Sequence, residues 1–169
     1  VPLILSKMIE STIGEFISSE EGKAKLENYK ENREYCDSLR HLFVSAFGKN
    51  CTLIATGGAA IPSELEELLV NKLRAPFVTG YGMTECAPVI CIGHKDKYKL
   101  KSCGEVITEC IEARINSVDP EHIPGEVHVK GDCVFSGYYK NPAVTAEVMT
   151  EDGWFRTGDM GVLDKEGTL

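Results

Sequence analysis

The sequence of 169 residues contains 43% hydrophobic and 26% charged residues, a composition typical of a globular chain and not of a disordered or fibrous one. Its 18 lysines and arginines stand against 26 aspartates and glutamates, which gives a formal net charge of −8 and no basic stripe for a phosphate backbone. We therefore expect no nucleic-acid partner, and the lack of any run of 18 apolar residues predicts no transmembrane segment.

The cysteines and histidines predict neither a disulfide framework nor a metal site. The seven cysteines are odd in number, scattered, and never spaced as C-x-x-C. This usage is typical of reduced thiols, so we predict a cytoplasmic location. No two of the four histidines have an i, i+4 spacing, and we assign them no metal.

The first fifty residues have the spacing of helices. Apolar residues recur at helical spacing over positions 5–17, which predicts an amphipathic helix whose apolar stripe needs a partner. Residues 18–34 carry nine charges of mixed sign and indicate a solvated helix face or a surface insertion. A second helical stripe covers residues 35–47, and Gly48 is well placed to end it in a left-handed turn.

The next segment has the order strand, loop, helix, strand. Residues 51–56 form a short apolar, β-prone run that ends at Gly57-Gly58. A helix is expected from Pro62, since proline suits the first helical turn, and residues 75–79 read as another strand before the loop 80–85. This order predicts a parallel βαβ unit.

After about residue 95 the pattern changes to short alternating segments between glycine and proline turns, at residues 104–107, 111–115 and 125–131. One short helix is expected over 141–149, and a hairpin from residue 161. We therefore predict an α/β fold in which the parallel βαβ portion of a doubly wound subdomain, residues 1–95, precedes a small antiparallel β-barrel-like subdomain, residues 96–169.

Two loops at predicted strand ends carry the candidate chemistry, as is usual in open α/β sheets. Small residues at 57–60 allow a flat ring to approach the backbone closely. The second loop offers an aromatic ring at Tyr81, a hydroxyl at Thr84 and a carboxylate at Glu85. Each feature also has a simpler interpretation, because paired glycines are commonly turns, a tyrosine is commonly a packing residue, and Gly80-x-Gly82 lacks the third glycine of a dinucleotide fingerprint.

The order of three motifs strengthens the functional interpretation. Gly-Gly-Ala-Ala-Ile-Pro at 57–62, Gly-Tyr-Gly-Met-Thr-Glu at 80–85 and Gly-Trp-Phe-Arg-Thr-Gly-Asp at 153–159 together resemble the signature of the adenylate-forming acyl-CoA synthetase family. Segments 125–131 and 136–142 also resemble family segments, so the resemblance covers nearly everything from residue 51 onward. The apolar start followed by a charged insertion resembles the long-chain fatty-acyl branch.

The resemblance implies a nucleotide site and a metal ligand. The residues concerned are Gly58, Ala59, Ala60, Gly80, Tyr81, Gly82, Thr84, Glu85 and Asp159. Tyr81 would stack on adenine, residues 58–60 would line the adenine and acyl pocket, and Thr84 would contact the α-phosphate. Glu85 would coordinate Mg²⁺, and Thr84 and Glu85 would be the catalytic residues. Asp159 would accept hydrogen bonds from the ribose hydroxyls, although without the resemblance it reads as a turn residue.

The implied reaction has two halves. A fatty carboxylate attacks the α-phosphorus of ATP to give acyl-AMP and pyrophosphate, and the CoA thiol then displaces AMP. The partners are thus small molecules: a fatty acid, ATP with Mg²⁺, and CoA. The family's Ser/Thr/Gly-rich phosphate loop and its lysine-bearing C-terminal lobe have no counterpart here, so we expect these residues alone to be inactive.

Three alternatives stay open. An aryl-CoA ligase is one, and an amino-acid adenylation module is another, although such modules more often carry proline where this chain has Met83. A non-catalytic nucleotide-binding module is the third. The chain starts without Met and stops just after an apparent strand and turn, from which we expect an internal piece of a longer ligase. We also expect the stripe over residues 5–17 to promote self-association, while peripheral membrane contact of the parent enzyme stays open.

Overall fold

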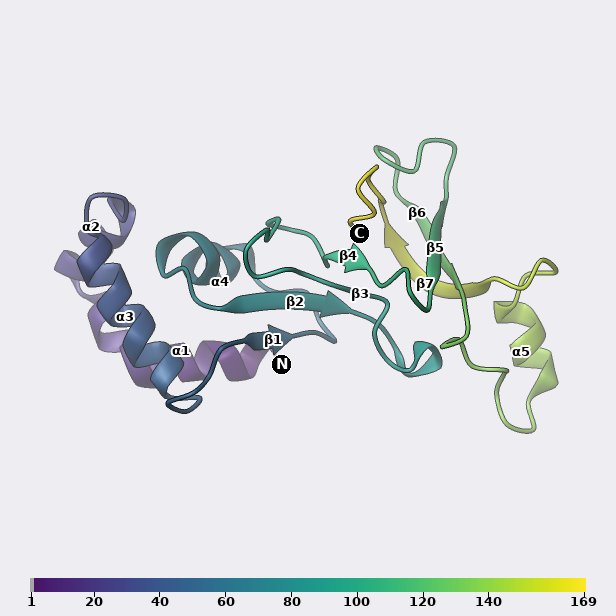
Figure 1. The fold of residues 1–169 in the computed structure, drawn as a ribbon, viewed down its shortest axis with the longest axis horizontal. Helices are drawn as coiled ribbons and strands as arrows, with labels where there is room; N and C mark the ends of the chain where they lie inside the picture. Colours follow the sequence, from purple (N-terminus) through teal and green to yellow (C-terminus); the bar gives the residue numbers. More distant parts are fainter. Residues whose placement is uncertain (1) are drawn as a thin grey trace. The chain divides into compact units, whose positions relative to one another are not determined.

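The computed structural model describes residues 2–169 and contains two compact units, which are described separately below (Figure 1). The first unit comprises the chain up to Val78 together with Lys95–Lys101. The second comprises Thr79–His94 and Ser102–Leu169. The division expected after residue 95 stays a prediction about the complete protein. Within residues 2–169, no helix has both the length and the apolar character needed to cross a bilayer.

The first unit begins with the helices that the apolar spacing predicts. They are α1 (Pro2–Ser18), α2 (Glu20–Glu27) and α3 (Arg33–Ser45). The stripe on α1 is buried at Leu5, Ile9 and Ile13, and α1 packs against α2 and α3. The partner that the stripe was predicted to need lies within the same unit, because α3 is long and amphipathic enough to cover it.

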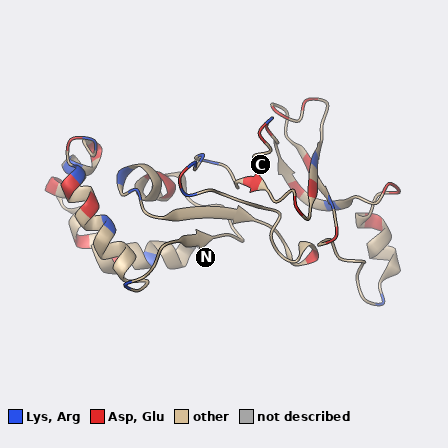
Figure 2. Ribbon diagram, viewed as in Figure 1, with Lys and Arg blue, Asp and Glu red and all other residues tan. Residues whose placement is uncertain are grey.

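The charged insertion is a solvated helix. In α2, Lys23 Nζ lies 2.9 Å from Glu20 Oε1 and Lys25 Nζ lies 2.6 Å from Glu21 Oε1. Three of the four side chains are exposed, and Lys25 is half-buried. Figure 2 shows acidic and basic residues of both signs along α2 and α3, whereas β1 (Ile54–Thr56) and β2 (Phe77–Tyr81) carry neither. Exposed ion pairs of this kind contribute little to the stability of the fold. The charged residues of α2 therefore form a solvated helix face, as the sequence predicts.

The βαβ order predicted for residues 51–79 is present. Strand β1 lies beside β2, and Ile54 N donates to Pro76 O at 2.6 Å. Between them in the chain are α4 (Ser63–Glu67) and a π-helical turn, η1 (Leu68–Lys72), in which Leu73 N bonds to Leu68 O. The expected single helix thus widens in its second half, which the apolar spacing did not indicate.

A buried carboxylate fastens the Lys95–Lys101 segment to the first unit. Glu66 on α4 is only 3% exposed. It accepts hydrogen bonds from Tyr98 Oη at 2.7 Å and from the backbone N of Lys101 at 3.1 Å. Buried polar groups are stable when they are hydrogen-bonded in this way, so Glu66 is a tether for a segment that would otherwise lie on the surface.

The second unit contains short antiparallel strands. The end of β2 pairs with β3 (Cys91–Ile92), and β3 pairs with β4 (Glu105–Val106). A separate sheet has the order β5 (Glu112–Asn116), β6 (Gly125–Lys130), β7 (Phe155–Gly161). The α/β class and the antiparallel second region are confirmed, although the three strands form an open sheet and not a closed barrel within residues 2–169.

The second unit also contains a short 3₁₀ turn and one short helix. The 3₁₀ turn η2 (Thr84–Cys86) follows β2, and the short helix α5 (Pro142–Val148) lies between β6 and β7. Phe155 at the start of β7 is buried, and its ring packs edge-on against Phe135 at 5.3 Å. Thr157, Gly158 and Asp159 lie within β7, whereas from the sequence alone Asp159 reads as a turn residue.

Candidate functional site

The loop after β2 folds back sharply onto Gly82. A Cβ built there would lie 1.9 Å from Pro88 O, so no residue other than glycine fits without moving the backbone. Ile90 N donates to Tyr81 O at 2.9 Å and closes the loop. At neighbouring Gly80 a Cβ would lie 3.2 Å from the Cys91 O of the paired strand. The glycines thus allow the tight return that presents η2 at the end of β2.

Within this loop the two predicted catalytic residues occupy different environments. Thr84 begins η2 and is exposed, whereas Glu85 is half-buried. The next residue, Cys86, is fully buried, and burial first of all raises the pKa of its thiol to about 11. A thiol with so high a pKa stays protonated at neutral pH, so Cys86 packs η2 onto the core and offers no nucleophile.

Strand β7 carries a bulge at its centre. The ladder with β6 pairs Glu126 with Met160 and His128 with Arg156. Residues 157–159 therefore stand opposite a single residue of β6. Such bulges re-aim side chains at the rims of sheets.

Side-chain hydrogen bonds hold the bulge in shape. Thr157 Oγ1 donates to Val127 O at 2.8 Å and accepts from Asp159 N at 3.1 Å. Gly158 has a φ of +78°, and its N–H donates to Glu126 Oε1 at 3.3 Å. Because three backbone and side-chain bonds converge on three residues, the direction in which the Asp159 carboxylate leaves the strand is well defined.

The β2 loop and the β7 bulge meet in a tyrosine–carboxylate pair. Tyr81 Oη donates to Asp159 Oδ2 at 2.7 Å, although 78 residues separate the two in sequence. Burial raises the pKa of Tyr81 well above its ordinary value, and the neighbouring Asp159 carboxylate raises it further. The phenol therefore keeps its proton at neutral pH and donates it to the carboxylate.

A second tyrosine–carboxylate pair lies in the same unit. Tyr138 Oη donates to Glu85 Oε1 at 2.9 Å, and this hydrogen bond is the main reason why the pKa of Tyr138 is raised. The backbone N of Phe135 also donates to Glu85 O at 2.7 Å. The sequence offered a signal for Tyr138, since residues 136–142 have a family-like pattern, but the pattern assigns the tyrosine no role.

The structure places the predicted site residues in two groups. Gly80, Tyr81, Gly82, Thr84, Glu85 and Asp159 all belong to the second unit. Residues 58–60 belong to the first unit, where they form an exposed loop after β1. Gly58 has a φ of +79°, and no atom lies within 4 Å of the position that a Cβ would occupy. The small side chains of that loop leave its backbone accessible, as the flat-ring hypothesis requires.

The acidic residues of the chain do not build a complete metal cage. Within residues 2–169, no three His, Cys, Asp or Glu side chains gather closely enough to hold a metal ion. Glu85 Oε1 accepts the bond from Tyr138, and among the described residues Oε2 has no protein partner. A single available carboxylate suits Mg²⁺, which proteins commonly bind through one or two carboxylates together with nucleotide phosphates and water.

Comparison with known sequences gives a consistent result. The family described as AMP-binding enzyme matches residues 1–139. Long chain acyl-CoA synthetase 1 of Arabidopsis thaliana is 38% identical over 129 residues, covering 72% of this chain and 19% of the relative. 4-Coumarate–CoA ligase 1 of the same plant is 35% identical and covers 69% and 23%. The human long-chain-fatty-acid–CoA ligase 1 is 31% identical and covers 100% and 26%.

Comparison with solved structures finds CoA ligases and synthetases as well. ATP-bound MatB from Rhodopseudomonas palustris superposes with a TM-score of 0.61 at 27% identity, over 69% of this chain and 24% of that one. o-Succinylbenzoate CoA synthetase from Bacillus subtilis, bound to a CoA product analogue, gives 0.65 at 27%, over 78% and 28%. The chain thus spans about a fifth to a quarter of the length of its curated relatives.

Proposed function

We propose, from the premise that this chain belongs to the AMP-binding enzyme family, that it supplies part of the nucleotide site of an ATP-dependent, AMP-forming acyl-CoA ligase. The observation that carries the proposal is the meeting of Tyr81 and Asp159 at 2.7 Å. An aromatic ring and a carboxylate from distant strands are thereby brought to one place, with Thr84 and Glu85 on the adjoining turn. These are the groups that a base, a ribose and charged phosphates require.

Each side chain has a role that its chemistry supports. The Tyr81 ring offers a face for adenine, and the Asp159 carboxylate accepts hydrogen bonds from two ribose hydroxyls. The exposed Thr84 hydroxyl donates to an α-phosphate oxygen. Glu85 would hold Mg²⁺, which when bound neutralises phosphate charge. Residues 58–60 would line the adenine and acyl pocket of the complete site.

The reaction proposed for the complete protein proceeds by displacement at phosphorus. A carboxylate oxygen of the acid bonds to the α-phosphorus of ATP while the bond to pyrophosphate breaks, giving acyl-AMP. The CoA sulfur then bonds to the acyl carbon while the bond from that carbon to the AMP oxygen breaks, and the thiol proton is released to solvent. The chain's own residues position the nucleotide and stabilise the charge that develops on the α-phosphate, which accounts for most catalysis of phosphoryl-type transfer.

A long-chain fatty acid is the substrate class that we favour. The human long-chain-fatty-acid–CoA ligase aligns with all of this chain, including α1 to α3, whereas the 4-coumarate–CoA ligase aligns with 69% of it. The support for the long-chain class is this full-length alignment with the human enzyme, since the Arabidopsis long-chain synthetase covers 72% of the chain, close to the 69% of the 4-coumarate–CoA ligase. An aryl acid is the second candidate, because identity over the shared region is similar for the two classes, at 38% and 35%.

The remaining expectations about the protein stay predictions. The odd number and scattered spacing of the cysteines support a reducing, cytoplasmic compartment. Self-association would rest on the exposed α1 residues Leu3, Ile4 and Phe16. Within residues 2–169 no consecutive glycines precede a Ser/Thr and lysine pair that could cradle a triphosphate, so the 169 residues alone should not catalyse adenylation.

The test uses the complete protein and measures acid-dependent exchange of labelled pyrophosphate into ATP. Hexadecanoic acid should support exchange and coumaric acid should not, since the two acids differ in shape and length. Asp159→Ala should raise the KM for ATP because the ribose contact exists in both the bound substrate and the transition state. Exchange with neither acid would refute the ligase proposal, exchange with coumaric acid alone would assign the aryl class, and an unchanged KM would remove Asp159 from the site.

A further inference from the structure

The segment between β6 and α5 holds the backbone of Tyr138 firmly. Tyr138 N donates to Thr145 Oγ1 at 2.9 Å, and the same hydroxyl donates to Asn141 O at 2.9 Å. Gly137 has a φ of +137°, and a Cβ there would lie 2.7 Å from Thr145 Cγ2. The loop is therefore closed tightly onto α5, with little freedom for the residue that follows Gly137.

The Tyr138 ring is held by aromatic packing. It meets the Phe135 ring at 4.8 Å with an interplanar angle of 70°, and Phe135 in turn meets Phe155 at 5.3 Å. Phe155 is part of the buried core of the second unit. These edge-to-face contacts pack the Tyr138 ring against the core through Phe135, so the position of its hydroxyl is fixed.

The Glu85 side of the contact is also fixed. The turn η2 is anchored by the buried Cys86, whose N–H bonds to Met83 O at 2.9 Å. Phe135 N donates to Glu85 O at 2.7 Å and Tyr138 Oη donates to Glu85 Oε1 at 2.9 Å. One loop thus binds both the backbone and the side chain of the same glutamate.

We infer that Tyr138 is a positioning residue, which holds the Glu85 carboxylate in the rotamer that binds the magnesium ion accompanying the nucleotide. The inference rests on the proposed function, since it takes the metal role of Glu85 from there. Tyr138 itself touches neither metal nor phosphate in this scheme. Its hydroxyl occupies Oε1, orients the carboxylate and leaves Oε2 for the metal. Partners of this outer-shell kind commonly set metal affinity by fixing the ligand's orientation.

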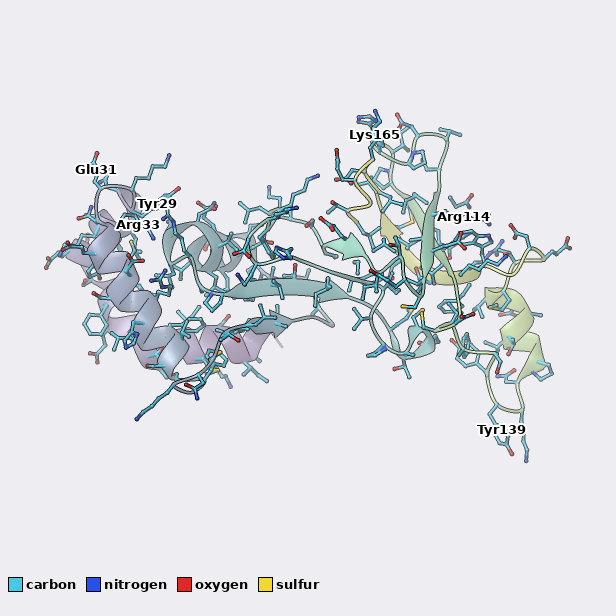
Figure 3. All side chains as sticks on the ribbon, in the orientation of Figure 1. Tyr29, Glu31, Arg33, Arg114, Tyr139 and Lys165 are labelled. Carbon is cyan, nitrogen blue, oxygen red and sulfur yellow. The ribbon has the colours of Figure 1, made fainter. Side chains whose placement is uncertain are left out.

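The neighbouring tyrosine supplies a matched control. Tyr139 is 88% exposed, and Figure 3 shows its side chain projecting from the loop before α5. Its only described ring contact is the Lys140 ammonium at 5.2 Å. Tyr139→Phe therefore removes the same hydroxyl from the same loop without touching Glu85.

The experiment measures ATP binding to the complete protein by calorimetry at a series of Mg²⁺ concentrations, for the unmodified protein, Tyr138→Phe and Tyr139→Phe. Tyr138→Phe should raise the Mg²⁺ concentration for half-maximal binding about tenfold, the lower end of the effect of losing an outer-shell partner. Tyr139→Phe should leave it unchanged. In a Glu85→Gln background the Tyr138→Phe effect should vanish, because the two residues act as one unit.

The remaining outcomes separate the possible failures. A wild-type protein with Mg²⁺-dependent ATP binding and an equal Mg²⁺ requirement in both tyrosine variants would overturn the positioning role while leaving the ligase proposal intact. Lower thermal stability of Tyr138→Phe with an unchanged Mg²⁺ requirement would overturn it equally. No acid-dependent pyrophosphate exchange in the wild type would refute the proposed function itself.

Discussion

In the first unit half of the buried core residues lie on the helical stripes of α1 and α3, whereas in the second unit polar side chains far apart in sequence are joined by hydrogen bonds. The packing of these helices is driven by burial of apolar surface, a strong effect that does not depend on direction. The tyrosine–carboxylate pairs are directional and only partly buried, so they contribute orientation more than stability. Substitutions in the two units should therefore change different measured quantities.

The largest effect is expected in the helical core. Phe43 on α3 is fully buried, while Leu42 beside it is 43% exposed. Phe43→Ala should lower the free energy of unfolding by about 3–5 kcal/mol through lost burial and a cavity. Leu42→Ala should cost less than about 1 kcal/mol. Urea unfolding followed by circular dichroism measures both, and similar losses in the two variants would contradict a core built on this stripe.

The buried tether of the first unit should rank second. Glu66→Ala removes the acceptor for Tyr98 Oη and Lys101 N inside the protein. Leaving a buried donor without its acceptor costs about 1–3 kcal/mol. Hydrogen exchange should also show faster exchange at Lys101. The exposed Glu64 on the same helix is the control, and its replacement by Ala should change neither stability nor exchange. Equal exchange at Lys101 in both variants would argue against the tether.

A third comparison replaces a glycine by alanine in each unit, with opposite expected effects on thermal stability. Gly14 lies inside α1 with room for a Cβ, so Gly14→Ala should stabilise the first unit by about 0.5–1 kcal/mol. Gly158 in the β7 bulge has a φ of +78°, where an alanine costs about 1–2 kcal/mol. Thermal unfolding should therefore shift in opposite directions. Stabilisation by Gly158→Ala would show that the bulge is not held in this conformation.

The smallest effect concerns an exposed pair in the second unit. His122 Nδ1 lies 3.0 Å from Asp119 Oδ1, which raises the pKa of His122 and lowers that of Asp119. A raised folded-state pKa means that the histidine's contribution to stability is present below its ordinary pKa and is lost as pH rises through the raised value. The lowered Asp119 pKa acts in the opposite sense, since its contribution is lost as pH falls through it. NMR titration should show the His122 pKa falling in Asp119→Asn, and an unchanged value would exclude the pair.

The sequence predicted best those features that depend on local periodicity. The helices α1 and α3 follow from stripes over residues 5–17 and 35–47, and β6 follows from alternation over 125–131. The strand β7 was not predicted, because the bulge at residues 157–159 breaks the alternation that marks a strand. The partner of the α1 stripe was missed because helix–helix contacts leave no trace in either helix alone.

For the site, motif resemblance placed Tyr81, Glu85 and Asp159 in one nucleotide pocket, and the structure brings Tyr81 and Asp159 into contact. The role assigned to each residue stays a prediction. Tyr138 lies in a family-like segment but was assigned no role, because its hydrogen bond to a carboxylate 53 residues away does not follow from the local pattern. Hydrogen-bond partners across a fold depend on the final register of the strands, which sequence patterns constrain only weakly.

The bulge in β7 has a consequence for how this segment tolerates changes in length. Three residues of β7 stand opposite one residue of β6, so β7 has two more residues here than a regular ladder would have. Because side chains alternate between the two faces of a sheet, an insertion of two leaves Arg156 and Met160 on the same face. Losing or gaining a pair of residues there would preserve that facing, whereas a single deletion would reverse the facing of the exposed Met160 and of Gly161, the last two residues of β7. Length variation at this point should therefore occur in even steps, because odd steps would invert the remainder of the strand.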